Sequence, residues 1–214
     1  MHIETLVVGP LATNCYVVSC PKSRAGMIVD PGGEAERIAR YVQEARLQVT
    51  WIVNTHGHAD HIGANAALKE IFRSAKLAIH PADAEMLAEP RLNLSLITGA
   101  DVRSPAADVL LTESDGVEVG ALGFRVIHLP GHTPGGIGLY RDASTGGQGG
   151  VVLSGDVLFA GSVGRFDLPG GDPDELIRAI KARLLVLPDP CAVYPGHGPA
   201  TTVERERIGN PFLQ

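Results

Sequence analysis

The stretch His56-Gly57-His58-Ala59-Asp60-His61 places four side chains that can bind a metal within six residues. In an extended or turn segment His56 and His58 point to the same side, so both can reach one cation. Asp60 and His61 are adjacent in the sequence and more naturally serve a neighbouring centre. Imidazole combined with carboxylate suits zinc, iron or manganese better than calcium. The stretch therefore predicts a transition-metal site.

Two predicted elements would position this stretch. The run Val49-Thr50-Trp51-Ile52-Val53 is β-branched and aromatic, which is typical of a buried strand. Residues 64–72 are rich in helix formers and carry an apolar stripe, which predicts a helix. The metal-capable residues therefore lie on a turn from a strand end into a helix start, where the carboxylate of Asp60 is favourable.

Three more metal-capable residues, His132, Asp156 and His197, follow predicted strands and are flanked by glycine. Glycine at such a place lets the backbone turn sharply and lets a ligand approach closely. Two other histidines, His80 and His128, also lie beside strand ends. We expect these two to be packed or hydrogen-bonded rather than metal-binding.

The remaining pattern predicts alternating short strands and amphipathic helices without a domain boundary, so residues 1–214 are expected to form one domain. Further strands are expected at 3–8, 15–19, 26–29, 76–80, 109–112, 116–119, 124–129, 151–156 and 192–197. Helices are expected at 34–45, at 81–88 with proline at the first position, and from a cap at Asp172 onward. A glycine-rich hairpin is expected at 144–150.

Two features allow two interpretations each. In residues 89–107, which include Leu94 and Leu96, the apolar residues follow neither a helical nor a strand periodicity. The segment therefore forms either a flap beside the site or a surface loop without a function. Asp30 precedes Pro31-Gly32-Gly33, and a turn explains it without a further role. The alternative is that Asp30 supports the metal site.

The composition excludes several classes of partner. The chain has 214 residues, 44% hydrophobic and 20% charged, with a formal charge of −6 and no basic block. A nucleic acid or an anionic membrane is therefore not an expected partner. The N-terminus lacks the pattern of a signal peptide, and the three cysteines show no CxxC spacing, so we expect free, buried thiols and a cytoplasmic location.

The pattern His56-x-His58-x-Asp60-His61 resembles the signature of the metallo-β-lactamase superfamily. The resemblance implies an α/β fold, a four-layer αββα sandwich with the metals at one edge. It further implies two divalent metal ions, zinc by preference, with iron or manganese as alternatives. One metal would be held by His56, His58 and His132 and the other by Asp60, His61 and His197, with Asp156 bridging. Asp60 and Asp156 would thereby be the catalytic carboxylates.

Within the superfamily, two stretches resemble glyoxalase II-like proteins: residues 162–171, which include Gly164-Arg165-Phe166-Asp167, and the ending Asn210-Pro211-Phe212-Leu213. That resemblance implies hydrolysis of a small acyl-thioester such as S-lactoylglutathione by a hydroxide that two metals generate from water. No protein nucleophile is then required. Arg165 is either a substrate contact or part of an ion pair with Asp167 that fixes the loop.

The sequence leaves several alternatives open. Glyoxalase II has a C-terminal helical domain that binds glutathione, and this chain ends without one, which leaves the thiol carrier undetermined. No cysteine occupies a ligand position, in contrast to β-lactamases that use one. A mononuclear-iron persulfide dioxygenase is less compatible, because Gly198-Pro199 follows His197 where that family has Asp-Tyr. A lactonase and a homo-oligomer are compatible with the sequence, whereas retention of every candidate ligand speaks against a non-catalytic binding protein.

Overall fold

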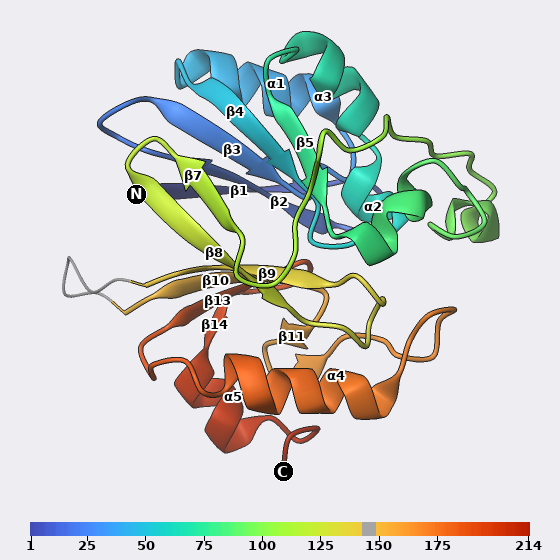
Figure 1. Cartoon of the computed structure of the whole chain (residues 1–214), viewed down its shortest axis with the longest axis vertical. Coiled ribbons are helices and arrows are strands. Elements are labelled where there is room, and N and C mark those ends of the chain that lie inside the picture. Colours follow the sequence, from blue (N-terminus) through green and yellow to red (C-terminus); the bar gives the residue numbers. More distant parts are fainter. Residues whose placement is uncertain (143–148) are drawn as a thin grey trace.

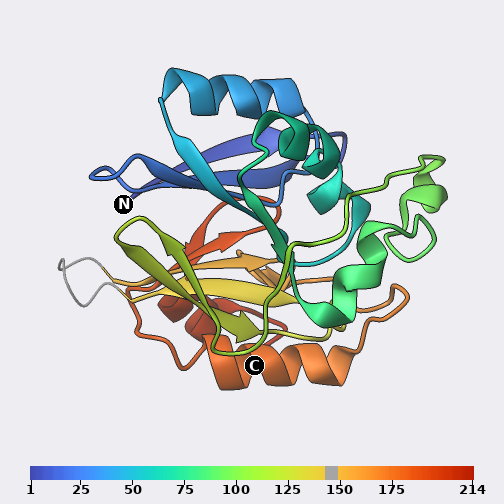
Figure 2. The same ribbon diagram turned by 45° about the horizontal axis from the view of Figure 1, so that its top comes forward.

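Two six-stranded β-sheets pack face to face, and helices cover the outer face of each (Figure 1). The computed structural model describes residues 1–142 and 149–214. The hairpin expected at 144–150 lies mostly outside the described residues. The turned view shows the same four layers, with α1 and α3 over one sheet and α4 under the other (Figure 2). The αββα sandwich is confirmed.

The first sheet has the order β1-β2-β3-β4-β5-β6, antiparallel from β1 to β3 and parallel from β3 to β6. Its strands are β1 (His2–Val8), β2 (Thr13–Ser19), β3 (Ala25–Val29), β4 (Gln48–Val53), β5 (Lys76–Ile79) and β6 (Val109–Leu110). Its helices are α1 (Ala35–Glu44), α2 (Ala59–Ile62) and α3 (Asn65–Ile71), with the 3₁₀-helices η1 (Pro81–Leu87) and η2 (Ser95–Thr98) after β5. Strands β2 and β3 are buried at every residue, as expected for strands covered on both faces.

The second sheet has the order β14-β13-β10-β9-β8-β7. Its strands are β7 (Gly116–Val119), β8 (Leu122–His128), β9 (Ile137–Arg141), β10 (Val151–Gly155), β13 (Ala192–Pro195) and β14 (Thr201–Thr202). The outer helices are α4 (Pro173–Ala179), which continues as the π-helix η3 (Ile180–Leu184), and α5 (Val203–Gly209). A separate small hairpin pairs β11 (Leu158–Phe159) with β12 (Ser162–Val163).

Three apolar layers hold the sandwich together. The central layer joins the two sheets, and its members include Met27, Val29, Phe124, Leu139 and Leu153. A second layer packs α1 and α3 on the first sheet, and a third packs α4, η3 and α5 on the second. Burial of these side chains away from water is the main stabilising term for such an architecture. No helix among the described residues is long and apolar enough to cross a membrane.

Strand direction brings the metal-capable residues to one edge. Strands β3, β4 and β5 run parallel, so Asp30, His56 and His80 follow the same end of the first sheet. In the second sheet β8 and β10 are both antiparallel to β9, and β10 is parallel to β13. The turns that carry His132 and His197 therefore leave from one edge as well.

A contact between the two sheets closes this edge. Asn14 Nδ2 on β2 donates hydrogen bonds to the carbonyl oxygens of Pro195 (3.0 Å) and Gly198 (2.8 Å). Thr13 forms an isolated β-bridge with His197. The first sheet thereby holds the turn at the end of β13.

Most predicted elements are confirmed, and several elements were not predicted. The helix expected at 81–88 is confirmed as a 3₁₀-helix, in which N–H groups bond three residues back, as Asp83 does to His80 (3.1 Å). The 3₁₀-helix η2 and the two-residue strands β11, β12 and β14 were missed. Strand β9 was missed because Gly138 weakens the strand signal; the glycine lies close against Leu129 and Leu153. Helix α5 was also missed.

The segment 89–107 is anchored at its middle. The buried Asn93 donates to the carbonyls of Met86 (3.0 Å) and Val102 (2.9 Å), and its own carbonyl accepts from Ala59 N on the metal-capable turn (2.9 Å). Leu96 and Ile97 are exposed. The segment thus touches the turn between His58 and Asp60, while its function as a flap stays a prediction.

We expect Asp172→Ala to lower the free energy of unfolding by about 1 kcal/mol, the usual cost of a lost N-cap. The Asp172 carboxylate caps α4 by accepting a hydrogen bond from Glu175 N (2.9 Å). The backbone N–H of Asp172 donates to the carbonyl oxygen of Gly131 (2.8 Å), next to His132. Asp174→Ala in the same turn is the control and should cost less than half as much. Urea unfolding of both variants measures the difference, and equal losses would contradict the capping role.

Candidate metal centre

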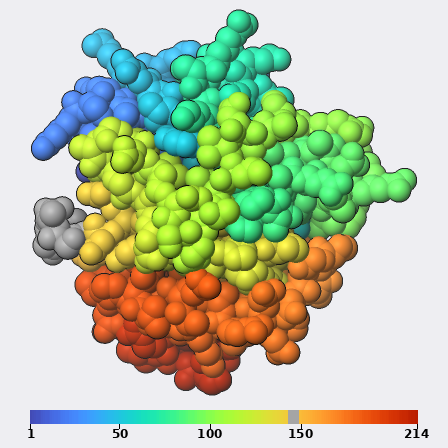
Figure 3. Space-filling view, viewed as in Figure 1, coloured from blue at the N-terminus to red at the C-terminus, as the bar shows by residue number. Residues whose placement is uncertain are grey.

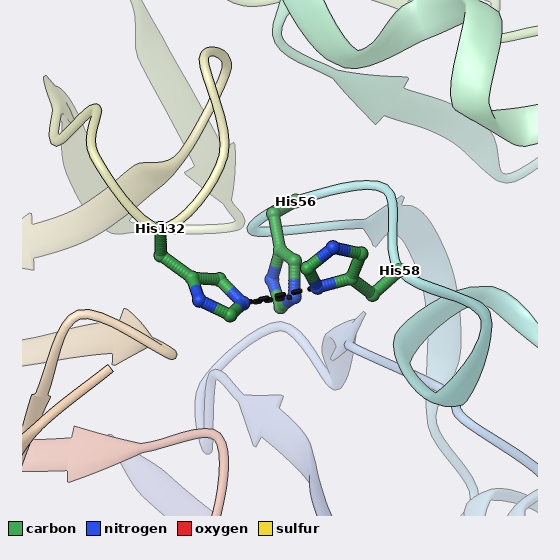
Figure 4. Close-up of side chains that lie close together, drawn as sticks. All are labelled: His56, His58 and His132. Atoms are coloured by element: carbon green, nitrogen blue, oxygen red, sulfur yellow. Dashed lines mark hydrogen bonds between the residues drawn. The ribbon is translucent and has the colours of Figure 1, made fainter. Parts of the chain in front are cut away.

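Three histidine rings converge between the two sheets (Figure 4). His56 and His58 come from the turn after β4, and His132 comes from the turn after β8. His132 Nε2 lies 3.0 Å from His58 Nδ1 and 3.3 Å from His56 Nε2. All three side chains are buried, and their ligand atoms lie within 4.8 Å of one another. This arrangement has the form of a three-histidine cation site.

A second group lies beside the first and consists of Asp60, His61 and His197. Asp60 Oδ2 lies 3.2 Å from His197 Nε2 and 3.5 Å from His61 Nε2. Thr13 Oγ1 donates to the same carboxylate oxygen at 3.1 Å. The residues that the sequence assigned to a second metal are thus brought together.

Asp156 lies between the two groups. Its Oδ1 is 3.5 Å from His61 Nε2, and its Oδ2 is 3.5 Å from His197 Nε2 and 3.7 Å from His132 Nε2. One carboxylate therefore reaches histidines of both groups, which is the position a bridging ligand requires. All seven predicted residues meet at one place, and their function as ligands stays a prediction.

Backbone carbonyls orient two of the rings. His132 Nδ1 lies 2.7 Å from Arg165 O, and His197 Nδ1 lies 3.1 Å from Leu11 O. A carbonyl only accepts, so the Nδ1 atoms carry the protons in these bonds. In the neutral rings the lone pairs are then on the Nε2 atoms, which face the centre.

Asp30 orients two further rings. Its carboxylate is buried and accepts from Thr55 N and Thr55 Oγ1, both at 2.7 Å. Because the Thr55 hydroxyl proton is used there, Thr55 Oγ1 accepts from His56 Nδ1 at 3.1 Å. Asp30 Oδ2 also lies 3.1 Å from His61 Nδ1. The turn interpretation of Asp30 is therefore incomplete, because its side chain supports two candidate ligands.

Burial decides the protonation of the three-histidine group. Burial lowers the pKa of His58 to about 3, and it lowers the pKa of His56 well below the usual value. Both rings are therefore neutral near pH 7 and have lone pairs to offer. For His61 burial also lowers the pKa, but the carboxylates of Asp156, Asp60 and Asp30 outweigh it and raise that pKa well above its usual value. The carboxylates that favour a proton on His61 would favour a metal cation in its place.

The orphaned atoms of the site test whether metal ions would fit. His58 Nε2, both ring nitrogens of His61 and Asp156 Oδ1 are buried without a hydrogen-bond partner, although His61 Nδ1 has the carboxylate of Asp30 beside it. A buried polar atom left unpaired costs about 1–3 kcal/mol, so such atoms call for a partner. His61 Nε2 and Asp156 Oδ1 lie among the converging nitrogen and oxygen donors, a set that suits zinc or iron. The residues present fit two cations.

Glycine leaves room for these donors. A Cβ atom at Gly196 would overlap Asp156 Oδ1 and would lie 2.7 Å from His61 Cε1. Gly198, two residues on, has φ +73° and no atom near its Cβ position. The glycines of this turn therefore serve two different ends, space at Gly196 and backbone conformation at Gly198.

The other residues singled out in the sequence lie at the margin. The Arg165 side chain is exposed and pairs with Asp167 through two bonds of 2.9 Å, so substrate contact by Arg165 stays a prediction. His80 and His128 stack with ring centroids 4.2 Å apart, and each makes a hydrogen bond to backbone. Among the described residues neither belongs to a metal-capable group, as expected.

Residues 8–197 match the family described as the metallo-beta-lactamase superfamily. The chain belongs to this superfamily. Three relatives in the superfamily align with almost the whole of this chain. An uncharacterized protein of Aquifex aeolicus is 42% identical, covering 99% of this chain and 97% of its own. The probable metallo-hydrolase YqgX of Bacillus subtilis is 37% identical, and the hydroxyacylglutathione hydrolase GloC of Haemophilus influenzae is 36% identical, each covering 100% of this chain and 98% of its own.

Solved structures of the superfamily superpose closely. The BLEG-1 B3 metallo-beta-lactamase has a TM-score of 0.93 at 38% identity, with 100% of each chain covered. TTHA1623 in a di-iron-bound form has a TM-score of 0.85 at 39% identity, with 98% of this chain and 100% of the TTHA1623 chain covered. ETHE1 from Myxococcus xanthus has a TM-score of 0.81 at 29% identity, with 99% of this chain and 84% of the ETHE1 chain covered. These superfamily members support a metallo-enzyme, and the one whose name gives a metal, TTHA1623, is in a di-iron-bound form.

We expect Gly196→Ala to remove metal from the folded protein, because the added methyl group would occupy the place of Asp156 Oδ1. Gly198→Ala is the matched control: it should cost about 1–2 kcal/mol of stability through its left-handed backbone and keep its metal. Metal content by elemental analysis and urea unfolding separate the two effects. Full metal content in Gly196→Ala would show that the turn can move away.

Proposed function

We propose that this protein is a two-metal hydrolase of small acyl-thioesters, with S-lactoylglutathione as the representative substrate. The observation that carries the proposal is the position of Asp156, within 3.5–3.7 Å of histidines from both groups. Two adjacent cation sites that share one carboxylate are the arrangement of enzymes in which water attacks a carbonyl or phosphoryl group. The 36% identity to GloC over the whole chain supports a thioester as substrate.

In this proposal the first metal is held by His56, His58 and His132, and the second by Asp60, His61 and His197, with Asp156 serving both. Two such cations supply Lewis acidity, which lowers the pKa of water toward about 7 and polarises a carbonyl oxygen. Zinc suits the donors and also a thiolate leaving group, and iron is the alternative.

The side chains around the centre would hold the reacting groups in place. Asp60 is itself fixed by the Thr13 hydroxyl at 3.1 Å, so its ionised carboxylate is held at a defined place beside His61 and His197. His132 and His197 keep their Nδ1 protons on backbone carbonyls and present Nε2 inward. None of these steps needs the protein to form a covalent bond with the substrate.

The described residues near the site offer no activated nucleophile. The Ser154 hydroxyl is buried and lies 3.4 and 3.3 Å from two backbone carbonyls, Gly155 O and Leu158 O. Burial raises the pKa of the Cys15 thiol far above its usual value, which disfavours the reactive thiolate. Water therefore remains the proposed attacking group.

We propose a cytoplasmic location, because Cys15, Cys20 and Cys191 are free and buried, as expected in a reducing compartment. The thiol carrier is proposed to bind weakly if it is glutathione. Its carboxylates need free cations, and the Arg165 guanidinium beside the site is already paired with Asp167.

The first test of this function is metal content. Zinc-replete protein is expected to contain two ions per chain, whereas Asp156→Ala should lose affinity for both, because its carboxylate serves both. His58→Ala should weaken only the three-histidine site. Elemental analysis and chelator competition measure both effects. One iron per chain would favour the persulfide dioxygenase, and wild-type metal content in Asp156→Ala would rule out the bridge.

The second test is the reaction itself. We expect S-lactoylglutathione to be hydrolysed equally fast under air and under nitrogen, with a high KM for glutathione-based substrates and a kcat that is not reduced to the same extent. Sulfite formation from glutathione persulfide with oxygen uptake would overturn the proposal.

The 38% identity to BLEG-1 makes a β-lactam the second candidate substrate, and lactones the third. Faster turnover of either would reassign the substrate and keep the hydrolytic chemistry.

A further inference from the structure

Asp83, on the 3₁₀-helix η1, joins the two turns that carry the three-histidine group. Its side chain is completely buried. Asp83 Oδ2 accepts from Gly57 N at 3.1 Å, and Gly57 separates His56 from His58. The same oxygen accepts from Thr133 Oγ1 at 2.7 Å, and Thr133 follows His132. Asp83 Oδ1 accepts from Gly135 N at 2.6 Å.

These contacts cross from one sheet to the other. The turn of His56 and His58 leaves the first sheet after β4, while the turn of His132 leaves the second sheet after β8. Within the described residues Asp83 is the carboxylate that hydrogen-bonds to both turns. The spacing between the two histidines of one sheet and the third of the other therefore depends on it.

The surroundings of Asp83 leave little freedom of movement. A Cβ atom at Gly135 would lie 2.6 Å from Asp83 Oδ1, and one at Gly57 would collide with the side chain of Met86 on the same helix. The start of η1 is fixed by His80, whose Nδ1 accepts from Ala82 N at 3.2 Å. The helix is thus packed tightly against both turns.

The Asp83 carboxylate is buried beside the three-histidine group. All three of its hydrogen-bond donors are neutral, two backbone N–H groups and one hydroxyl, and no salt bridge to Lys or Arg is formed with it among the described residues. A carboxylate buried among neutral partners is costly. A negative charge next to a cation site offsets that cost once a cation is bound.

We propose that Asp83 is a positioning residue that sets the geometry, and hence the metal affinity, of the three-histidine group. It touches no candidate ligand side chain and acts through the backbone turns that carry them. The inference rests on the proposed two-metal function, but it concerns one of the two sites only.

The test compares zinc binding by full-length wild type, Asp83→Asn and Thr133→Val. Asn keeps the shape of the side chain, removes the charge and turns one acceptor into a donor that faces Gly135 N. Loss of such an indirect partner typically weakens metal binding about 10–100-fold. We expect that loss for one zinc ion only, measured by competition with a chromophoric chelator, and an altered visible spectrum of the cobalt-substituted protein.

Two controls separate positioning from general stability. Thr133→Ser keeps the hydroxyl and should restore the affinity that Thr133→Val loses. Glu206→Gln tests a carboxylate of similar chemistry away from the histidine turns. Glu206 is buried and accepts from Thr201 Oγ1 (2.5 Å), Gly161 N (2.8 Å) and Asn210 Nδ2 (2.9 Å). Its variant should lose stability and keep wild-type affinity for both zinc ions.

The outcomes are distinguishable. If Asp83→Asn and Thr133→Val lose stability but bind both zinc ions like wild type, Asp83 is only structural and the inference is wrong. Should Asp83→Asn fail to fold, the Thr133→Val and Thr133→Ser pair decides alone. If wild type itself binds fewer than two zinc ions, the proposed function fails first.

Discussion

The buried polar atoms that face one another at the centre are the constraint on which this structure depends. Four of them have no hydrogen-bond partner, and at about 1–3 kcal/mol each their cost is comparable to the whole net stability of a domain, about 5–15 kcal/mol. Rings and carboxylates would relieve this cost by turning toward water. The fold prevents such movement by packing apolar layers on both faces of each sheet and by hydrogen bonds to the far side of the His56, His132 and His197 rings.

The contacts behind the rings come from many parts of the chain. Asp30, after β3, supports His56 through Thr55 and lies against His61, whereas His132 and His197 depend on the carbonyls of Arg165 and Leu11. The space-filling view shows that segments from the whole length of the chain, from blue to red, share one face of the molecule (Figure 3). Residues that never touch a substrate can therefore control how well the centre binds its cations.

Much of this was predictable from the sequence, because strand ends, glycine and histidine coincide there. The seven candidate ligands could be placed at strand ends from local patterns, and the direction of the strands brings them together. Asp83 could not be found in this way, since its partners, two backbone N–H groups and the Thr133 hydroxyl, are 26, 52 and 50 residues distant. For Asp30 two interpretations stayed open, because the turn before Pro31 is a sufficient local explanation and the partners Thr55 and His61 are distant in the sequence. Strand β9 was not predicted, because the close packing around Gly138 is a tertiary effect that strand propensity does not include.

The hydrogen bond from Asn14 to Pro195 joins residues 181 positions apart and has a consequence for the newly made protein. At roughly 5–20 residues per second, His197 leaves the ribosome some 7–30 s after His56. The first histidines must wait for their partners through that interval, and the second donor group cannot exist before synthesis is nearly finished. Loading with two metals, as proposed, would therefore follow the synthesis of nearly the whole chain and would draw on the metals available where translation ends.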